Sequence, residues 1–230
     1  MKRLAVILVM LGAAPPACAA PPSRVELTFA ITMGNTRIGE GREVLEHDGQ
    51  RYRIVSESRP RGIAALFINE VRRESRGIID GNGLRPDHFE ESGRCGGTRT
   101  AKFDWAATQL ALIDGNGART VALPRGTLDQ TSLAYAFSFR PVSGEAVEVH
   151  VTDGRGVRHY RYRELGQETL VTPLGEIKAR HFEKVRDPDD KRGFEFWLAP
   201  DRHLLPVKLR YVERNGDVFD SIITEIRAQQ

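Results

Sequence analysis

The stretch LPRGTLDQTSLAYAFSFR, Leu123–Arg140, is the one part of the chain after its N-terminus that lacks the pattern of a β-strand. Thr127 is a good N-cap residue, and Gln130 three residues later completes the pattern of a capping box. Leu133 and Phe137 lie four residues apart, so they share one face of the helix that this pattern starts. The sequence therefore predicts a short helix with an apolar side.

The predicted helix spans Thr127–Phe139, because Pro141 cannot continue it. We expect its apolar side to face the rest of the protein and Gln130 and Ser138 to be exposed. In this interpretation the helix is a plug or lid packed on a large curved sheet.

Repeated turn sequences divide much of the remaining chain into hairpins. They combine Asp or Asn with Gly, as tight hairpin turns require: Asp48-Gly49, Asp80-Gly81-Asn82-Gly83, Asp114-Gly115-Asn116-Gly117 and Asp153-Gly154-Arg155-Gly156. Strands joined by such turns predict a mainly β protein. We expect an antiparallel meander that forms a strongly curved sheet or a (half-)barrel with one principal short helix.

Two details of this meander are expectations at the level of single residues. If Asn215-Gly216 is a two-residue turn, Tyr211 pairs with Asp220 and Leu209 with Ile222. The segment Ile63–Ile68 is compatible with a helical turn or a strand, and we expect a loop there that runs into a strand at Asn69–Ile79.

The N-terminus has the pattern of a secretory signal peptide over Met1–Ala19. Lys2 and Arg3 precede the short apolar run Leu4–Ala14, and Ala17-Cys18-Ala19 supplies the small residues of a cleavage site. The apolar run is shorter than the roughly 20 residues that span a bilayer, so we expect no transmembrane segment in the mature chain. Pro15 and Pro16 do not fit a lipobox, which argues against lipidation of Cys18. The sequence thus predicts a periplasmic protein whose residues 20–230 form a single mainly β domain.

The charge balance excludes one class of partner. Removal of residues 1–19 leaves 32 basic residues against 31 acidic ones, spread evenly along the chain. Near-neutrality without a basic patch gives no basis for nucleic-acid binding.

Motifs of catalysis and metal binding are absent from the sequence. The six histidines have no H-x-x-x-H or H-E-x-x-H spacing, and no G-x-S-x-G is present. The acidic run Asp187-Pro188-Asp189-Asp190-Lys191 has Lys where a calcium loop needs a third oxygen ligand. Cys95, alone after removal of the signal, is interpreted as a tolerated loop cysteine. We therefore expect no cofactor and no metal, and an enzyme is the least favoured class.

The aromatic residues suggest a binding site. Trp105, Tyr135, Phe137 and Phe196 are candidates for lining a cavity between the sheet and the helix. The alternative is that these four side chains form part of the ordinary core, as apolar residues usually do.

Several short motifs in a fixed order carry a family resemblance. They are Phe103-Asp104-Trp105, Leu123-Pro124-x-Gly126, Asp129-x-x-Ser132-Leu133-x-Tyr135, and Trp197-Leu198-Ala199-Pro200 followed by Leu205-Pro206-Val207. With them the chain resembles the bacterial exported proteins of the domain-of-unknown-function 3108 family. The resemblance implies an exported, predominantly β protein and supplies no catalytic residues.

Two functions remain open at this point besides the disfavoured enzyme. One is a binding module for an apolar or amphipathic, lipid-like molecule. The other is an envelope interaction or assembly factor that docks through a strand edge or surface. A cavity with an apolar lining favours the first, and a packed interior with an apolar surface patch favours the second.

Overall fold

The computed structural model describes residues 20–66, 69–94, 97–140 and 146–229. The expected signal peptide, Cys18 and Cys95 lie outside these ranges. Within them the chain forms strands throughout, with one α-helix and two short 3-10 helices. The elements are β1 Arg24–Met33, β2 Thr36–His47, β3 Arg51–Pro60, η1 Gly62–Leu66, β4 Val71–Asp80, β5 Gly83–Arg94, β6 Gly97–Asp104, β7 Gln109–Asp114, β8 Gly117–Ala122, β9 Leu128–Asp129, α1 Ser132–Phe139, β10 Ala146–Thr152, β11 Val157–Thr172, β12 Gly175–Lys184, β13 Gly193–Ala199, η2 Pro200–Arg202, β14 Leu205–Val212 and β15 Val218–Gln229.

All the strands belong to one sheet, in the order β8-β7-β6-β5-β4-β3-β2-β1-β15-β14-β13-β12-β11-β10-β9. Every neighbouring pair is antiparallel except β9 and β10, which are parallel. The first and last strands therefore lie side by side in the middle of the sheet, and its two ends are β8 and β9. The predicted meander with one principal helix is confirmed.

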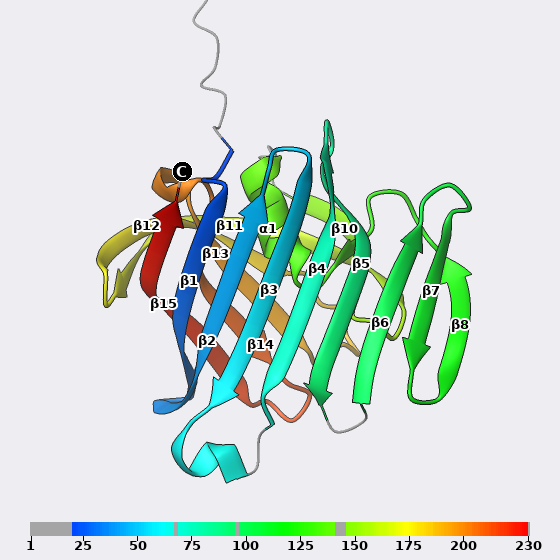
Figure 1. Cartoon of the computed structure of the whole chain (residues 1–230). Helices are drawn as coiled ribbons and strands as arrows, with labels where there is room; N and C mark the ends of the chain where they lie inside the picture. Colours follow the sequence, from blue (N-terminus) through cyan, green and yellow to red (C-terminus); the bar gives the residue numbers. More distant parts are fainter. Residues whose placement is uncertain (1–19, 67–68, 95–96, 141–145, 230) are drawn as a thin grey trace, which may run out of the picture.

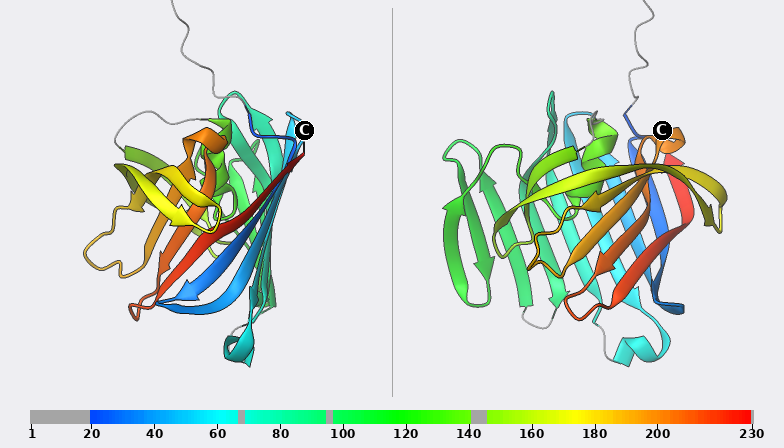
Figure 2. Two further views of the ribbon diagram at one scale, coloured as in Figure 1. Left: turned by 90° about the vertical axis from the view of Figure 1, so that its left-hand side faces the viewer. Right: turned by 180° about the vertical axis from the view of Figure 1, so that it is seen from behind.

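The sheet folds into two walls around α1. Figure 1 shows β1–β8 as the near wall, and Figure 2 shows the other strands curving behind it, with the two walls meeting where β1 pairs with β15. α1 lies between the walls, where it contacts β5, β9 and β14. The sheet does not close, so the molecule is an open half-barrel with an internal helix.

The helix is shorter than predicted. It begins at Ser132, because Oδ1 of Asp129 accepts hydrogen bonds from the N–H groups of Thr131 and Ser132, each at 2.9 Å. The hydroxyl of Thr127 donates to the carbonyl oxygen of Pro124 at 2.7 Å, so Thr127 does not cap the helix. Asp129 is as good a cap residue as Thr127, and it lies closer to the helix start.

The expected exposure of two helix-region residues is also wrong. Ser138 is 1% exposed, and its hydroxyl donates to the carbonyl oxygen of Leu204 at 3.2 Å. The amide of Gln130 is partly buried and donates to Glu91 of β5 at 3.0 Å. Both sides of α1 thus face protein, because the half-barrel surrounds it.

The last hairpin is one residue out of the expected register. Its loop is Glu213–Asp217 rather than a two-residue turn, so Tyr211 pairs with Phe219 and Leu209 with Ser221. Hydrogen bonds between Asn215 and Asp217 hold this longer loop. The pairing of each residue shifts by one because the loop is longer than a two-residue turn.

The segment after β3 also differs from the expectation. Gly62–Leu66 forms the 3-10 helix η1 where we expected a loop, and β4 begins at Val71 rather than at residue 69. The helical turn was the alternative that the sequence left open.

Two apolar clusters fill the interior. The large one packs α1 against the strands around the β1–β15 seam and the far wall, and the small one, built on Phe89, Phe103, Leu110, Leu112 and Leu123, lies under β5–β8. The molecule therefore has a boundary between two cores, and the open end of the half-barrel lies beside it.

Candidate functional site

A groove of about 740 Å³ opens beside α1, between the β4–β5 turn, the segment that follows β8, and β10. Its apolar lining comes from both cores and from the helix: Leu84, Trp105, Leu123, Leu128, Leu133, Ala136, Phe137, Val147 and Val149. β9 pairs with β10 only at Val151 and Thr152, so the earlier part of β10 has no strand on that side among the residues that the structure describes. The groove therefore lies at the gap that the open sheet leaves.

Contacts between aromatic rings form one wall of the groove. Phe137 of α1 packs against Phe182 and Phe196, with ring centroids 5.1 and 5.3 Å apart. On the opposite side, Trp105 stacks on Phe103 at 5.8 Å, and its indole N–H donates to the carbonyl oxygen of Pro86 at 2.7 Å. Packed aromatic rings of this kind form rigid apolar walls.

The four aromatic candidates from the sequence separate into two pairs. Trp105 and Phe137 line the groove. Phe196 is fully buried behind Phe137, and Tyr135 is buried with its hydroxyl directed at Glu43. The structure thus brings two candidates to the groove and places the other two in the packing and polar contacts behind it.

The groove has a charged rim. Arg85, Arg125 and Arg140 lie on it together with Asp80 and Glu148. The guanidinium of Arg85 lies 3.7 Å from Asp80, and Glu148 lies 3.5 Å from the ring of His159. His150 also lines the rim, and burial, followed by the charge of His159, lowers its pKa, which favours the neutral ring near pH 7.

A ladder of polar side chains crosses the near wall on its inner side. We call Glu43, Ser56, Arg73, Glu91 and Arg99 the polar belt; they are direct cross-strand neighbours from β2 to β6. Arg73 donates to Glu91 at 2.7 Å, and Arg99 donates to the other oxygen of the same carboxylate. Glu91 is 1% exposed and Arg99 is 7% exposed. The belt therefore buries charge deeply, compensated by ion pairs and hydrogen bonds.

The polar belt also holds α1. The Tyr135 hydroxyl donates to Glu43 at 2.6 Å, and the Ser56 hydroxyl donates to the other oxygen of that carboxylate at 3.1 Å. Burial raises the pKa of Glu43, while these two hydrogen bonds and the charge of Arg73 oppose the rise. The belt thus anchors the helix from the side opposite its aromatic contacts.

A second buried polar cluster fixes the start of the helix. Ser75 donates to Oδ2 of Asp129 at 2.5 Å, so the Tyr52 hydroxyl, 3.2 Å from the Ser75 oxygen, is the donor in their contact. Burial raises the pKa of Asp129 to about 6, against the hydrogen bonds from Ser75, Thr131 and Ser132. Asp129 and Ser75 are 0% exposed, so no substrate reaches them, and we assign this cluster to structure.

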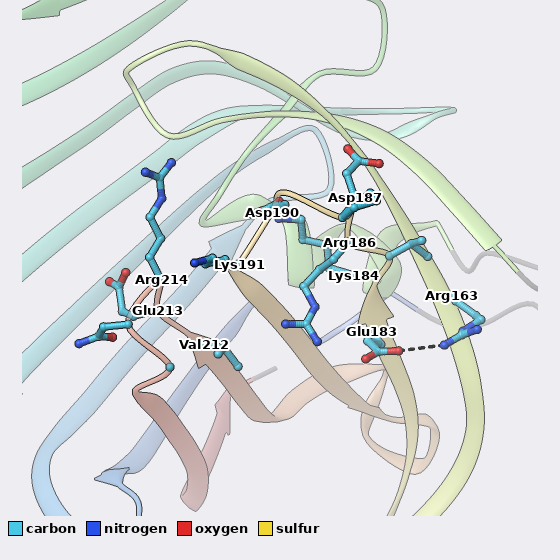
Figure 3. A pocket seen from close by; sticks show the side chains of 14 residues that line it. Arg163, Glu183, Lys184, Arg186, Asp187, Asp190, Lys191, Val212, Glu213 and Arg214 are labelled. Carbon is cyan, nitrogen blue, oxygen red and sulfur yellow. Dashed lines mark hydrogen bonds and ion pairs between the residues drawn. The ribbon is translucent and has the colours of Figure 1, made fainter.

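A different hollow lies at the far wall, between the β12–β13 and β14–β15 loops (Figure 3). Charged side chains of both signs line it, and several pair with each other: Arg163 with Glu183 at 3.1 Å, and Lys184 with Asp190 at 2.5 Å. The acidic run at Asp187 belongs to this loop, where the Asp190 N–H bonds to the Asp187 carbonyl oxygen. The lining of this hollow is mainly charged, and several of its charges are already paired with each other, whereas the groove beside α1 has a largely apolar floor, so we place the candidate site at the groove.

Metal binding has no support within the described ranges, where no three His, Cys, Asp or Glu side chains are grouped to hold an ion. In the same ranges no helix is long and apolar enough to cross a membrane.

The sequence missed the rim arginines and the contribution of β10. Arg125 lies within the motif Leu123-Pro124-x-Gly126, and Arg85 lies shortly after the Asp80–Gly83 turn, but an evenly charged sequence does not distinguish them from other surface arginines. Asp129 was present in a motif as well, and its spacing to Ser132 is the signal that identifies the helix cap.

Comparison with known proteins identifies the family. The family model described as "Protein of unknown function (DUF3108)" matches residues 28–222, and the chain belongs to that family. No curated protein matches the sequence.

Comparison with solved structures gives likenesses at low sequence identity. A β-barrel-like protein of the domain of unknown function DUF1849 from Brucella abortus is 9% identical, with a TM-score of 0.60 over 92% of this chain and 100% of that one. A "putative lipoprotein" from Parabacteroides distasonis is also 9% identical, with a TM-score of 0.39 over 90% and 97% of the two chains. The first of these likenesses establishes a shared β-barrel-like fold.

Proposed function

We propose that this protein is an exported, non-catalytic binding module of the cell envelope, and that the groove beside α1 holds the apolar part of an amphipathic, lipid-like molecule. The observation that carries the proposal is the groove itself: an apolar floor from two cores and a helix, open at one side and charged at its rim. Its volume of about 740 Å³ falls within the range of roughly 300–1,000 Å³ that is usual for small-molecule sites.

The construction of the groove supports binding rather than catalysis. Its lining is apolar at the floor, and its ionisable groups are spread around the rim. The buried carboxylates of the molecule, Glu43, Glu91 and Asp129, hold structural hydrogen bonds elsewhere. A catalytic site needs convergent acids, bases or nucleophiles, and the groove does not bring such groups together.

Export through the N-terminal segment is part of the proposal. Cleavage after Ala19 leaves residues 20–230, which we propose form one domain, and Cys18 is removed with the signal. Intact-mass measurement on protein recovered from the periplasm tests this. A mass that starts at Ala20 supports it, and a diacylglyceryl adduct on Cys18 contradicts it.

The binding proposal is tested by filling the groove. Ala136 is half-buried on α1 and lines the groove, so Ala136→Trp places a large side chain inside it. Ala228→Trp makes the same change at an exposed site on β15, outside the groove. We expect an environment-sensitive apolar probe to bind saturably to the unmodified protein and to Ala228→Trp, and weakly to Ala136→Trp. Equal binding by the two variants contradicts the assignment of the site.

The assembly-factor function is the alternative. It is favoured by β8, an edge strand that, among the described strands, is paired with β7 alone and is exposed along most of its length. Such an edge is a template for strand addition by another chain. If the unmodified protein binds no apolar probe saturably, the binding proposal fails and this alternative takes its place.

A further inference from the structure

We infer that the groove selects amphiphiles whose headgroup is an anion, a carboxylate or a phosphate, and that Arg125 and Arg140 bind this headgroup. The inference rests on the proposed function, because the apolar chain of the ligand occupies the groove. It adds the chemical class of the ligand.

The rim of the groove has more positively charged than negatively charged side chains. Three arginines, Arg85, Arg125 and Arg140, line it together with two carboxylates, Asp80 and Glu148, and Asp80 is paired with Arg85. Arg125 and Arg140 are exposed at the rim, and neither has an ion-pair partner within the part of the chain that the structure describes. These two guanidinium groups are therefore available to a ligand.

The backbone holds both arginines in place. Arg125 is the second residue of a turn closed by the hydrogen bond from the Thr127 N–H to the Pro124 carbonyl oxygen at 3.3 Å. The third residue of this turn is Gly126, whose φ of +72° is typical of a type II turn. Arg125 thus has a defined position although it lies in a loop.

Arg140 is fixed from the other side of the groove. It directly follows α1, and its N–H donates to the Ala136 carbonyl oxygen at 3.0 Å. A Cβ atom placed on Gly83 would lie only 3.1 Å from the Cβ of Arg140, so Arg140 is packed against the β4–β5 turn. The two arginines therefore lie on separate segments that both line the groove, Arg125 in a hydrogen-bonded turn and Arg140 at the end of α1.

The chemistry of this arrangement selects a headgroup. Guanidinium groups donate paired hydrogen bonds to carboxylates and phosphates, and a cationic headgroup would meet like charge. An amphiphile with an anionic head can place its chain on the apolar floor and its charge at the rim. Neutral amphiphiles gain only the contribution of the chain.

The experiment compares headgroups on one chain length. Binding of dodecanoate, dodecyl phosphate, neutral monododecanoylglycerol and cationic dodecyltrimethylammonium is measured by calorimetry or probe displacement below their micelle concentrations. We expect the unmodified protein to bind the better of the two anions about 10-fold more tightly than the neutral compound, as for two exposed ion pairs. Whichever anion binds more tightly identifies the source of the charge as a carboxylate or a phosphate.

The variants assign the selectivity to the two arginines. Arg125→Gln/Arg140→Gln removes both charges, and we expect it to bind anionic and neutral compounds with affinities within about 2-fold of each other. The control Arg37→Gln/Arg227→Gln removes two exposed charges that do not line the groove and keeps the selectivity. Added salt should weaken anion binding by the unmodified protein and leave binding of the neutral compound unchanged.

The outcomes separate the inference from the proposed function. Saturable binding of all four compounds with equal affinity overturns the inference and leaves the groove as a site for apolar chains. Selectivity that survives in Arg125→Gln/Arg140→Gln overturns the roles of these residues. The absence of saturable binding for every compound overturns the proposed function itself.

Discussion

The two walls of the half-barrel hold the same helix by different means. Behind α1, the far wall presents stacked rings, and Phe137 packs directly against Phe182 and Phe196. In front of it, the near wall presents the polar belt, and Glu43 of this belt accepts a hydrogen bond from Tyr135 of α1. Apolar packing is non-directional, so it allows small shifts of the helix. The buried hydrogen bonds are directional, so they require one position of the helix. Since α1 lines the groove, the polar belt determines the position of the α1 side of the groove.

The aromatic contact should have the largest effect on stability. Phe137→Ala removes a 3%-exposed ring from between the walls, and we expect it to lower the free energy of unfolding by about 3–5 kcal/mol. Phe139→Ala, on the same helix but only half-buried, should cost clearly less. Urea denaturation of both variants tests this, and equal losses would show that the far wall does not hold the helix.

Breaking the polar belt should come next. Glu91→Gln leaves Arg73 and Arg99 without their buried carboxylate, and we expect a loss of about 3 kcal/mol. Glu164→Gln removes a carboxylate that also pairs with an arginine, Arg180, but at a partly exposed site. That variant should cost at most about 1 kcal/mol. If the two losses are the same in denaturant titrations, burial of the belt has no energetic role.

The contribution of Asp129, at the start of α1, to stability should change with pH in the direction opposite to that of a carboxylate in a surface ion pair. Because the folded-state pKa of Asp129 is raised to about 6, its ionisation lowers stability as the pH rises from about 4 to about 6. Asp129→Asn keeps acceptor and donor atoms, so it should be more stable than the unmodified protein at pH 7, by about 1–3 kcal/mol, and equal to it near pH 4.

The matched variant is Glu74→Gln on the outer face of β4. The Arg53 and Arg72 guanidinium groups lower the pKa of Glu74 to about 2, so its stabilising contribution is present at pH 7 and fades as the pH falls toward 2. Thermal melts across this pH range distinguish the two signs. A loss of stability at pH 7 for Asp129→Asn would contradict the assignment of a penalty to its charge.

The smallest expected effect concerns the hydroxyl that joins helix and belt. Tyr135→Phe keeps the buried ring and removes one of the two side-chain donors to Glu43. We expect a loss of about 1 kcal/mol, the usual net contribution of one hydrogen bond to stability. No measurable loss would mean that the helix is positioned by the far wall alone.

The sequence predicted local features better than distant ones. Asp-Gly and Asn-Gly turns identified which strands are neighbours, because a hairpin is determined by residues close in the chain. The pairing of β1 with β15 and the gap between β8 and β9 depend on contacts between distant residues, which no local pattern contains. Trp105 and Phe137 are candidates from their residue type alone. The roles of Arg125, Arg140 and Val149 depend on contacts between distant residues, so they are visible only in the folded structure.

Methyl NMR spectroscopy with dodecanoate tests most directly whether the groove is the binding site. The account predicts saturable shift changes for methyl groups that line the groove, such as those of Leu84, Leu133 and Val149, and none for Val212 in the charged hollow. Saturable changes at Val212, with the methyl groups of the groove unmoved, would contradict it.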